Sequence, residues 1–197
     1  MHHASSSQRM FDNRWIDTLS KSHPVVNSTV LYGAGLILVA MAYETVLAAP
    51  LTVAGIALLS WLGWTLFEYL AHRYGFHYEP KTRFGQEIHR IMHGHHHDFP
   101  NDHERLMMPL GVSLTVLAVI LWTATSAFGT SHGLLVAGFI AIFFMNYDLI
   151  HFLTHKTSSP LPMGLKRRHM VHHFRDHDVN YGVSTVLWDR VFGTRRG

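Results

Sequence analysis

Ten histidines in four clusters are the residues of this sequence best suited to chemistry. Most of its 18 histidines lie between residues 72 and 177, and ten of them have metal-ligand spacing. The clusters are His72-x4-His77, His93-x2-His96-His97, His151-x3-His155 and His169-x2-His172-His173. Imidazole is the commonest protein ligand for transition metals. Ten nitrogens are too many for one ion and enough for two, so we expect a dimetal centre.

The H-x-x-H-H pattern suggests how two ions could share these ligands. On an α-helix, residues three or four positions apart lie on the same face. His151 and His155 can therefore bind one ion together, and so can His93 and His96. His97 would then point about 100° away from His96, towards a second ion. Pairing His93 with His97 is also geometrically possible, and the spacing leaves this alternative open.

The other two clusters follow the same geometry. His169 and His172 are three residues apart and can bind one ion, with His173 turned towards the other. His72 and His77 are five residues apart. On an α-helix that spacing separates them by about 140°, which favours one ligand for each metal.

Two carboxylates inside apolar stretches are candidates for a supporting role. Glu68 lies one helical turn before His72, and Asp148 lies three residues before His151. An acidic residue inside a membrane span is a functional candidate by default. We expect both to hydrogen-bond the second ring nitrogen of a ligand histidine and so to fix its tautomer. No further catalytic residue is predicted, and Glu44, nearer the outer end of its stretch, is expected to be uninvolved.

Four apolar stretches must position these clusters: Val30–Ala49, Leu51–Ala71, Met108–Phe128 and His132–Ile150. Each is long enough to cross a hydrocarbon core of about 30 Å as a helix. The first two stretches meet at Ala49-Pro50 and the last two at Gly129-Thr130-Ser131. Links this short predict two transmembrane hairpins.

Charge supports a membrane protein and sets its orientation. Only 15% of the residues are charged, below the roughly 25% of soluble domains. All 16 Lys and Arg residues lie outside the four stretches and none lies at a hairpin tip. The positive-inside rule therefore places the N-terminus, the central loop and the C-terminal tail in the cytoplasm. A soluble core of four long buried helices, with every cation on one side, is the weaker alternative.

Composition excludes several other classes. The chain has no cysteine, which rules out disulfides, thiolate metal sites and iron–sulfur clusters. A net charge of +3 gives no argument for nucleic acid. The polar N-terminal segment has no apolar core of a signal peptide.

We therefore predict an all-α integral membrane protein in which residues 1–197 form one domain. Residues 1–29 form a cytoplasmic segment, and residues 30–71 and 106–150 form the two transmembrane hairpins. Residues 72–105 and 151–197 form a cytoplasmic histidine-rich helical cap that holds the dimetal centre. This topology brings all four clusters to one membrane face and leaves His132, at an outer hairpin tip, outside the site.

These residues resemble the membrane fatty acid hydroxylases, within the larger fatty acid hydroxylase and sterol desaturase superfamily. The similarity extends from about Trp64 to Thr194, two-thirds of the chain. Its motifs include Glu68-Tyr-Leu-Ala-His72, Met92-His-Gly-His-His-His97, Tyr147-Asp-Leu-Ile-His151 and Arg168-His-Met-Val-His-His-Phe174. The H-H-x-x-P-x-D-x-x-R-L-x-x-P stretch from His96 to Pro109, and the closing Gly…Trp-Asp…Phe-Gly-Thr, are most similar to the fatty acid 2-hydroxylases.

The resemblance implies a ligand set of five histidines for each metal. One metal would be held by His72, His93, His96, His169 and His172. The other would be held by His77, His97, His151, His155 and His173. The resemblance also implies two iron ions, for which zinc can substitute in purified protein. The remaining histidines of this region match no ligand position: His89, His95, His103 and His177.

The sequence departs from the family at its N-terminus. Many eukaryotic 2-hydroxylases carry an N-terminal cytochrome b5 domain with a His-Pro-Gly-Gly haem motif. Here His23-Pro24 is followed by Val25-Val26, and the first 29 residues are too few for that domain. We therefore expect a separate electron donor of the ferredoxin or cytochrome type, and a bacterial inner-membrane setting.

The resulting hypothesis is an O2-dependent di-iron hydroxylase, an oxidoreductase that acts on an acyl chain of a fatty acid or lipid, at C2. Insertion of oxygen into an unactivated C–H bond requires a metal centre that binds O2. Alternatives within the superfamily are a lipid head-group, sterol or carotenoid hydroxylase, or a desaturase. More distant alternatives are a membrane zinc hydrolase and a metal transporter. A zinc hydrolase needs only three protein ligands, fewer than the ten histidines found here. A metal transporter should have ionisable groups deep within its spans, whereas the candidate ligands of this sequence cluster at one membrane face.

Overall fold

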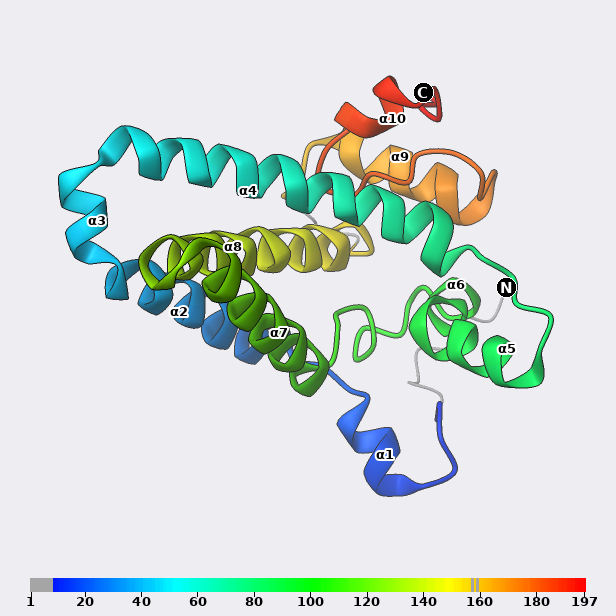
Figure 1. The fold of residues 1–197 in the computed structure, drawn as a ribbon. Coiled ribbons are helices and arrows are strands. Elements are labelled where there is room, and N and C mark those ends of the chain that lie inside the picture. The colour runs from blue at the N-terminus through cyan, green and yellow to red at the C-terminus, as the bar shows by residue number, and fades with distance from the viewer. Residues whose placement is uncertain (1–8, 157, 159) are drawn as a thin grey trace. The chain divides into compact units, whose positions relative to one another are not determined.

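The computed structural model describes residues 9–156, 158 and 160–197, and every regular element within them is helical (Figure 1). The first eight residues of the predicted segment 1–29 lie outside the described residues. The elements are α1 (Arg14–Leu19), α2 (Pro24–Met41), α3 (Tyr43–Ala48), α4 (Pro50–Leu70), η1 (Ala71–Phe76), α5 (Arg83–His89), η2 (Arg90–Gly94), α6 (His95–Asp98), α7 (Leu110–Phe128), α8 (Thr130–Thr154), α9 (Met163–Phe174) and α10 (Leu187–Val191). The elements η1 and η2 are π-helical. The predicted all-helical class is confirmed.

Four helices are long and apolar enough to cross a membrane: Pro24–Met41, Pro50–Phe76, Leu110–Phe128 and Thr130–Thr154. They match the four predicted stretches, with shifted ends. The first begins earlier than predicted because Pro24 occupies the first helical turn, where its missing N–H costs nothing. The fourth runs beyond Ile150 to Thr154, so that His151 lies within it.

The predicted first stretch, Val30–Ala49, is divided into α2 and α3. Ala42 separates them, with φ −94° and ψ 23°. Helix α3 ends at Ala48 because Ala49 precedes Pro50, and a residue before proline is driven out of the α region. Gly129 is the single residue between α7 and α8, and its φ of 75° lies in the left-handed region that favours glycine.

The described chain forms two compact units. The apolar unit comprises His23–Trp64 and Met108–Leu149. Its core is centred on Ala42, Leu134 and Leu135, with apolar side chains of α2, α3, α4, α7 and α8 packed around them. In α8 half of the apolar window is buried within the molecule, against 17% in each of the other three spans. Helix α8 is therefore the central helix, and the other three have apolar faces left for lipid.

Helices α2 and α8 approach each other closely inside the apolar unit. A Cβ on Gly35 would lie 2.9 Å from the Gly138 carbonyl oxygen, and a Cβ on Gly138 would lie 2.8 Å from that of Gly35. Small residues allow such backbone contact between membrane helices. The arrangement of the four spans as two transmembrane hairpins stays a prediction.

The histidine unit comprises the described residues of three segments, which are the chain up to Ser22, Thr65–Met107 and Ile150–Gly197. It contains all four histidine clusters, including His151 on the last turn of α8. These three segments are far apart in the sequence. The N-terminal one contains α1, which the sequence analysis did not include in the histidine-rich cap. The assignment of residues 1–197 to one domain stays a prediction.

Candidate metal centre

The first histidine group is assembled from η1 and the residue just beyond it, the η2–α6 segment, and α9. It consists of His72, His77, His93, His97 and His172. The Nε2 atom of His72 lies 3.2 Å from that of His93 and 3.2 Å from that of His77. The Nε2 atoms of His77 and His172 are 3.0 Å apart, and those of His93 and His97 are 2.9 Å apart.

His72 and His77 lie in one group, whereas the helical geometry of the sequence analysis favoured one of them for each metal. Their separation of 140° assumed an α-helix, whereas this segment is π-helical. The His77 N–H donates to the His72 carbonyl at 3.2 Å, the i→i+5 bond of a π-helix. Residues five apart therefore stack on one face, and π-turns of this kind are frequent at functional sites.

The second group is assembled from α6, the end of α8, the residue just beyond it, and α9. It consists of His96, His151, His155, His169 and His173. The Nε2 atom of His96 lies 2.9 Å from those of His151 and His173. The Nε2 atoms of His155 and His169 are 2.8 Å apart.

The division of the ligands between the groups also differs from the prediction. His93 pairs with His97, not with His96, and His169 pairs with His173, not with His172. The two groups also differ from the division that the family resemblance implies. His169 and His173 both lie on α9, and on an α-helix four residues overshoot a full turn by about 40°, whereas three fall short by about 60°, so i,i+4 partners converge better. The alternative that spacing left open for His93 is the one adopted.

The spacing of the nitrogens fits one metal ion in each group. Within each group, one ring nitrogen of every histidine lies within 4.8 Å of all the others. A nitrogen ligand lies about 2.1 Å from an ion such as zinc, so ligands at right angles are about 3.0 Å apart. The neighbouring nitrogens, 2.8 to 3.2 Å apart, match that separation. The two groups adjoin, since the rings of His97 and His173 stack with centroids 4.2 Å apart.

The imidazoles are held in the neutral form that binds metals. Burial, and then the neighbouring His172, lower the pKa of His77 and of His97 to about 3. Burial lowers the pKa of His155 to about 2, although a hydrogen bond with the Pro100 backbone acts in the opposite direction. A metal requires a deprotonated imidazole nitrogen. These side chains therefore present a lone pair at neutral pH without losing a proton first.

The two groups differ in access. All five side chains of the second group are buried, whereas His77 and His97 of the first are partly exposed. A pocket of about 310 Å³ opens onto the first group and is lined by His77, Glu79, His89, Arg90, His93, Gly94, His97, Asp98 and His177. Small polar molecules can therefore reach the first group, while the second is enclosed by protein.

Backbone carbonyls fix the orientation of several rings. The Nδ1–H of His72 donates to the Tyr181 carbonyl at 2.6 Å, and that of His172 donates to the Val179 carbonyl at 2.8 Å. In the second group, the Nδ1–H of His151 donates to the Leu106 carbonyl at 3.0 Å. A proton on Nδ1 leaves the lone pair on Nε2, the atom that points into each group.

Glu68 and Asp148 do not act as the sequence predicted. The Glu68 carboxylate accepts the N–H of Val183 at 2.7 Å, the N–H of Ser184 at 2.9 Å, and the Ser184 hydroxyl. Asp148 accepts the N–H of Met108 at 3.1 Å. Both carboxylates bond to backbone, and it is carbonyl groups that take the second nitrogens of the histidines described above. Glu68 instead anchors the C-terminal segment that supplies the Tyr181 carbonyl.

Asp189 is a second anchor of that segment, which the sequence reasoning missed. Its carboxylate is fully buried and accepts the N–H of Tyr181 at 2.9 Å, the N–H of Gly182 at 2.9 Å and the Thr194 hydroxyl at 2.7 Å. Asp189 is part of the closing Trp-Asp…Phe-Gly-Thr motif of the sequence. The motif alone does not indicate that this aspartate fixes the segment that carries the Tyr181 carbonyl. Two buried carboxylates, Glu68 of α4 and Asp189 of α10, thus hold the segment that orients His72 and His172 of the first group.

The other histidines of the region lie outside both groups. His132 is exposed near the start of α8, in the apolar unit. The four histidines that match no ligand position, His89, His95, His103 and His177, belong to neither group. His95 is nevertheless buried, and its Nε2 lies 3.3 Å from an Asp102 carboxylate oxygen.

Comparison with known proteins agrees with this architecture. The fatty acid hydroxylase family matches residues 57–194. The dihydroceramide fatty acyl 2-hydroxylase FAH1 of Arabidopsis thaliana is 35% identical over 150 residues, which cover 74% of this chain and 60% of that protein. The fatty acid 2-hydroxylase of Homo sapiens is 33% identical over 164 residues, which cover 77% of this chain and 42% of that protein. The chain thus spans about half the length of these relatives.

A solved structure of full-length scs7p, in which only the hydroxylase domain is visible, has the same fold. It superposes with a TM-score of 0.88 at 26% identity, covering 100% of this chain and 75% of that one. The relatives named here give no support to a bacterial membrane, although the four apolar helices make the chain a multi-pass membrane protein. The matched family, the identities and the shared fold agree, and this chain belongs to the fatty acid hydroxylase family.

Proposed function

We propose that the protein is an O2-dependent hydroxylase that inserts one oxygen atom into an acyl chain of a fatty acid or lipid, at C2. The observation that carries this proposal is the pair of adjoining five-nitrogen groups, each of a size to hold one metal ion. The names of the relatives, which are fatty acyl and fatty acid 2-hydroxylases, support the acyl substrate and the C2 position.

Two iron ions are the metals that we propose for these groups. When bound, they would supply the activation of O2 that amino-acid side chains cannot perform. Neutral nitrogen donors suit iron as well as zinc, which explains why zinc could occupy the same positions in purified protein. The proposed ligands are His72, His77, His93, His97 and His172 for one ion, and His96, His151, His155, His169 and His173 for the other.

The protein would contribute ligand orientation and control of access. Carbonyl groups at Tyr181, Val179 and Leu106 hold three rings with Nε2 directed inward. Burial of the second group excludes water from one side of the centre. The polar pocket beside His77 and His97 would admit small molecules, among them protons and water, to the first group.

The membrane orientation belongs to the same proposal. The confinement of all 16 Lys and Arg residues to three segments outside the predicted spans supports a cytoplasmic position for the termini and the histidine-rich cap. An acyl chain could then remain in the lipid while its head group reaches the centre from the membrane surface. Electrons would come from a separate carrier of the ferredoxin or cytochrome type.

Isotope labelling of the product tests the reaction. Membranes containing the protein, supplied with a reductant and 18O2, should yield acyl lipids heavier by one labelled oxygen, and mass spectrometry should place it at C2. His96→Ala should abolish the product, and His132→Ala, a histidine outside both groups, should not. Label taken from water instead of O2 would favour a hydrolase. Loss of two hydrogens without added oxygen would mean a desaturase. Label in the head group would mean that the protein hydroxylates the head group and not the acyl chain.

A further inference from the structure

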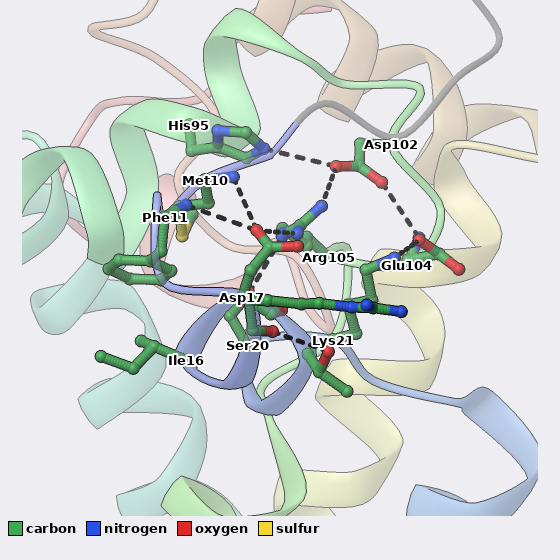
Figure 2. A network of polar contacts seen from close by, with 12 residues as sticks. Met10, Phe11, Ile16, Asp17, Ser20, Lys21, His95, Asp102, Glu104 and Arg105 are labelled. Atoms are coloured by element: carbon green, nitrogen blue, oxygen red, sulfur yellow. Dashed lines mark hydrogen bonds and ion pairs between the residues drawn. The ribbon is translucent and has the colours of Figure 1, made fainter.

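A buried charged cluster joins the N-terminal segment to the loop that follows α6 (Figure 2). Arg105 lies between Asp17 of α1 and Asp102 of the loop, at 2.6 and 2.9 Å. The side chains of Arg105, Asp17 and Asp102 are only 3%, 9% and 4% exposed. Removal of one partner from a buried ion pair leaves an uncompensated charge, so these three groups depend on one another. With Ser20 and His95, they form what we call the Arg105 cluster.

Every polar edge of the Arg105 guanidinium is used. Its Nη2 donates to Asp17, its Nη1 to Asp102, and its Nε to the Ser20 hydroxyl at 3.1 Å. The Asp17 carboxylate also accepts the N–H of Met10 at 2.8 Å. A planar guanidinium with three such partners fixes direction as well as distance, which a lysine could not do. The cluster therefore locks the loop to α1 in one register.

The locked loop, Phe99–Met107, supports the second histidine group. Its Leu106 carbonyl, next in the chain to Arg105, accepts the Nδ1–H of His151 at 3.0 Å. His151 lies on the last turn of α8, so the loop orients a histidine of the second group directly.

The cluster also reaches the second group through α6. Asp102 lies 3.3 Å from Nε2 of His95, the neighbour of the ligand His96. The buried Nδ1 atoms of His96, His169 and His173 have no hydrogen-bond partner among the described residues. The loop is therefore a principal source of polar support for this group. In the first group, by contrast, His72 and His172 are supported by the C-terminal segment.

We infer that Arg105 is a positioning residue for the second histidine group. We also infer that the N-terminal segment, through Asp17, helps to hold that group in place. Arg105 acts through the loop and not by contact with a ligand. Its loss should loosen the second group and leave the first in place. This inference rests on the proposed metal centre and is independent of the reaction catalysed there.

Metal release from the purified, iron-loaded full chain tests the inference. The variants are Asp17→Ala, Arg105→Lys and Arg105→Met. The matched control is Glu104→Ala, because Glu104 adjoins Arg105 but forms an exposed ion pair with Lys21, with side chains 51% and 36% exposed. Loss of a group that orients a metal ligand typically weakens metal binding by about 10–100-fold. We expect one ion of the two to be released to a chelator faster by about that factor, and the other at the wild-type rate.

Hydrogen exchange of the same samples identifies the loosened group without reference to activity. Peptides covering 99–107 and 151–155 should exchange faster in Asp17→Ala, while those covering 179–186 should not change. The exchange rates of Arg105→Lys should lie between those of wild type and Asp17→Ala, because lysine keeps the positive charge and lacks the planar set of guanidinium donors. If Arg105→Met does not fold, the other two variants still decide.

The outcomes separate this inference from the proposed centre. Release of both ions at wild-type rates, or of both ions equally faster, in Asp17→Ala and Arg105→Lys would overturn the positioning role. A similar effect of Glu104→Ala would overturn it too, because any change in the loop would then suffice. Wild-type protein that binds fewer than two ions would instead refute the metal centre itself, and this inference with it.

Discussion

Replacement of Glu68 should destabilise the protein far more than replacement of an exposed glutamate in another apolar stretch. Glu68→Leu removes the acceptor of the Val183 and Ser184 N–H groups, at 2.7 and 2.9 Å, and of the Ser184 hydroxyl. A buried donor left without a partner costs about 1–3 kcal/mol, so the two N–H groups together cost about 2–6 kcal/mol. For a chain of this size, 1 kcal/mol corresponds to about 2–4 °C in Tm, which gives a fall of about 4–24 °C.

Glu68→Gln separates the hydrogen bonds from the charge. Its amide oxygen can still accept the two N–H groups, and its NH2 can donate to the Ser184 hydroxyl. We therefore expect a loss of about 1 kcal/mol, or about 2–4 °C. Glu44→Leu is the matched control, because Glu44 is exposed on α3.

Thermal unfolding in detergent, followed by tryptophan fluorescence, gives the comparison. One of the five tryptophans, Trp188, lies on α10 in the anchored segment and donates to Thr65 at 3.0 Å. Metal analysis of the same samples should show that Glu68→Leu loses the ion of the first group, because the Tyr181 carbonyl no longer holds His72. Equal Tm values for Glu68→Leu and Glu44→Leu, or a Glu68→Leu protein within about 2 °C of wild type, would refute the reasoning.

Three further predictions concern the metals, the topology and pH. Elemental analysis of iron-supplied protein should give two ions per chain, lowered by His151→Ala and unchanged by His132→Ala; one ion or none in folded wild type would contradict this. The chain has no cysteine, so single cysteines introduced at Gly85 and Thr130 can be labelled, and they should react from opposite sides of the membrane; labelling from one side would reject the predicted orientation. Metal-free protein should lose stability as the pH falls from about 6.5 towards 3, because burial lowers the pKa of His97 to about 3, and between those values the unfolded chain is protonated there and the folded chain is not. A Tm that is the same at pH 7.5 and pH 5.5 would count against buried neutral imidazoles.

The helical class, the four apolar helices and the histidine clusters could all be predicted from the sequence. Each depends on a local property: the length of an apolar run, or the type and spacing of a side chain. All ten histidines selected by spacing lie in the two groups. The presence of donors suited to two metals follows from composition and spacing alone, because no other residue type supplies ten neutral nitrogen ligands.

The sharing of the ligands was decided by the tertiary structure. His72 and His77 belong together because η1 is π-helical, and a change of helical register cannot be read from an H-x4-H pattern. The groups that orient the rings are backbone carbonyls at Leu106, Val179 and Tyr181. Every residue has a backbone carbonyl, so the residue types in a sequence do not show which carbonyls contact the histidines. Only folding brings these carbonyls to the histidines, because buried carboxylates distant in the chain fix the segments that carry them. For that reason the sequence identified the candidate ligands, and the tertiary structure divided them into two groups.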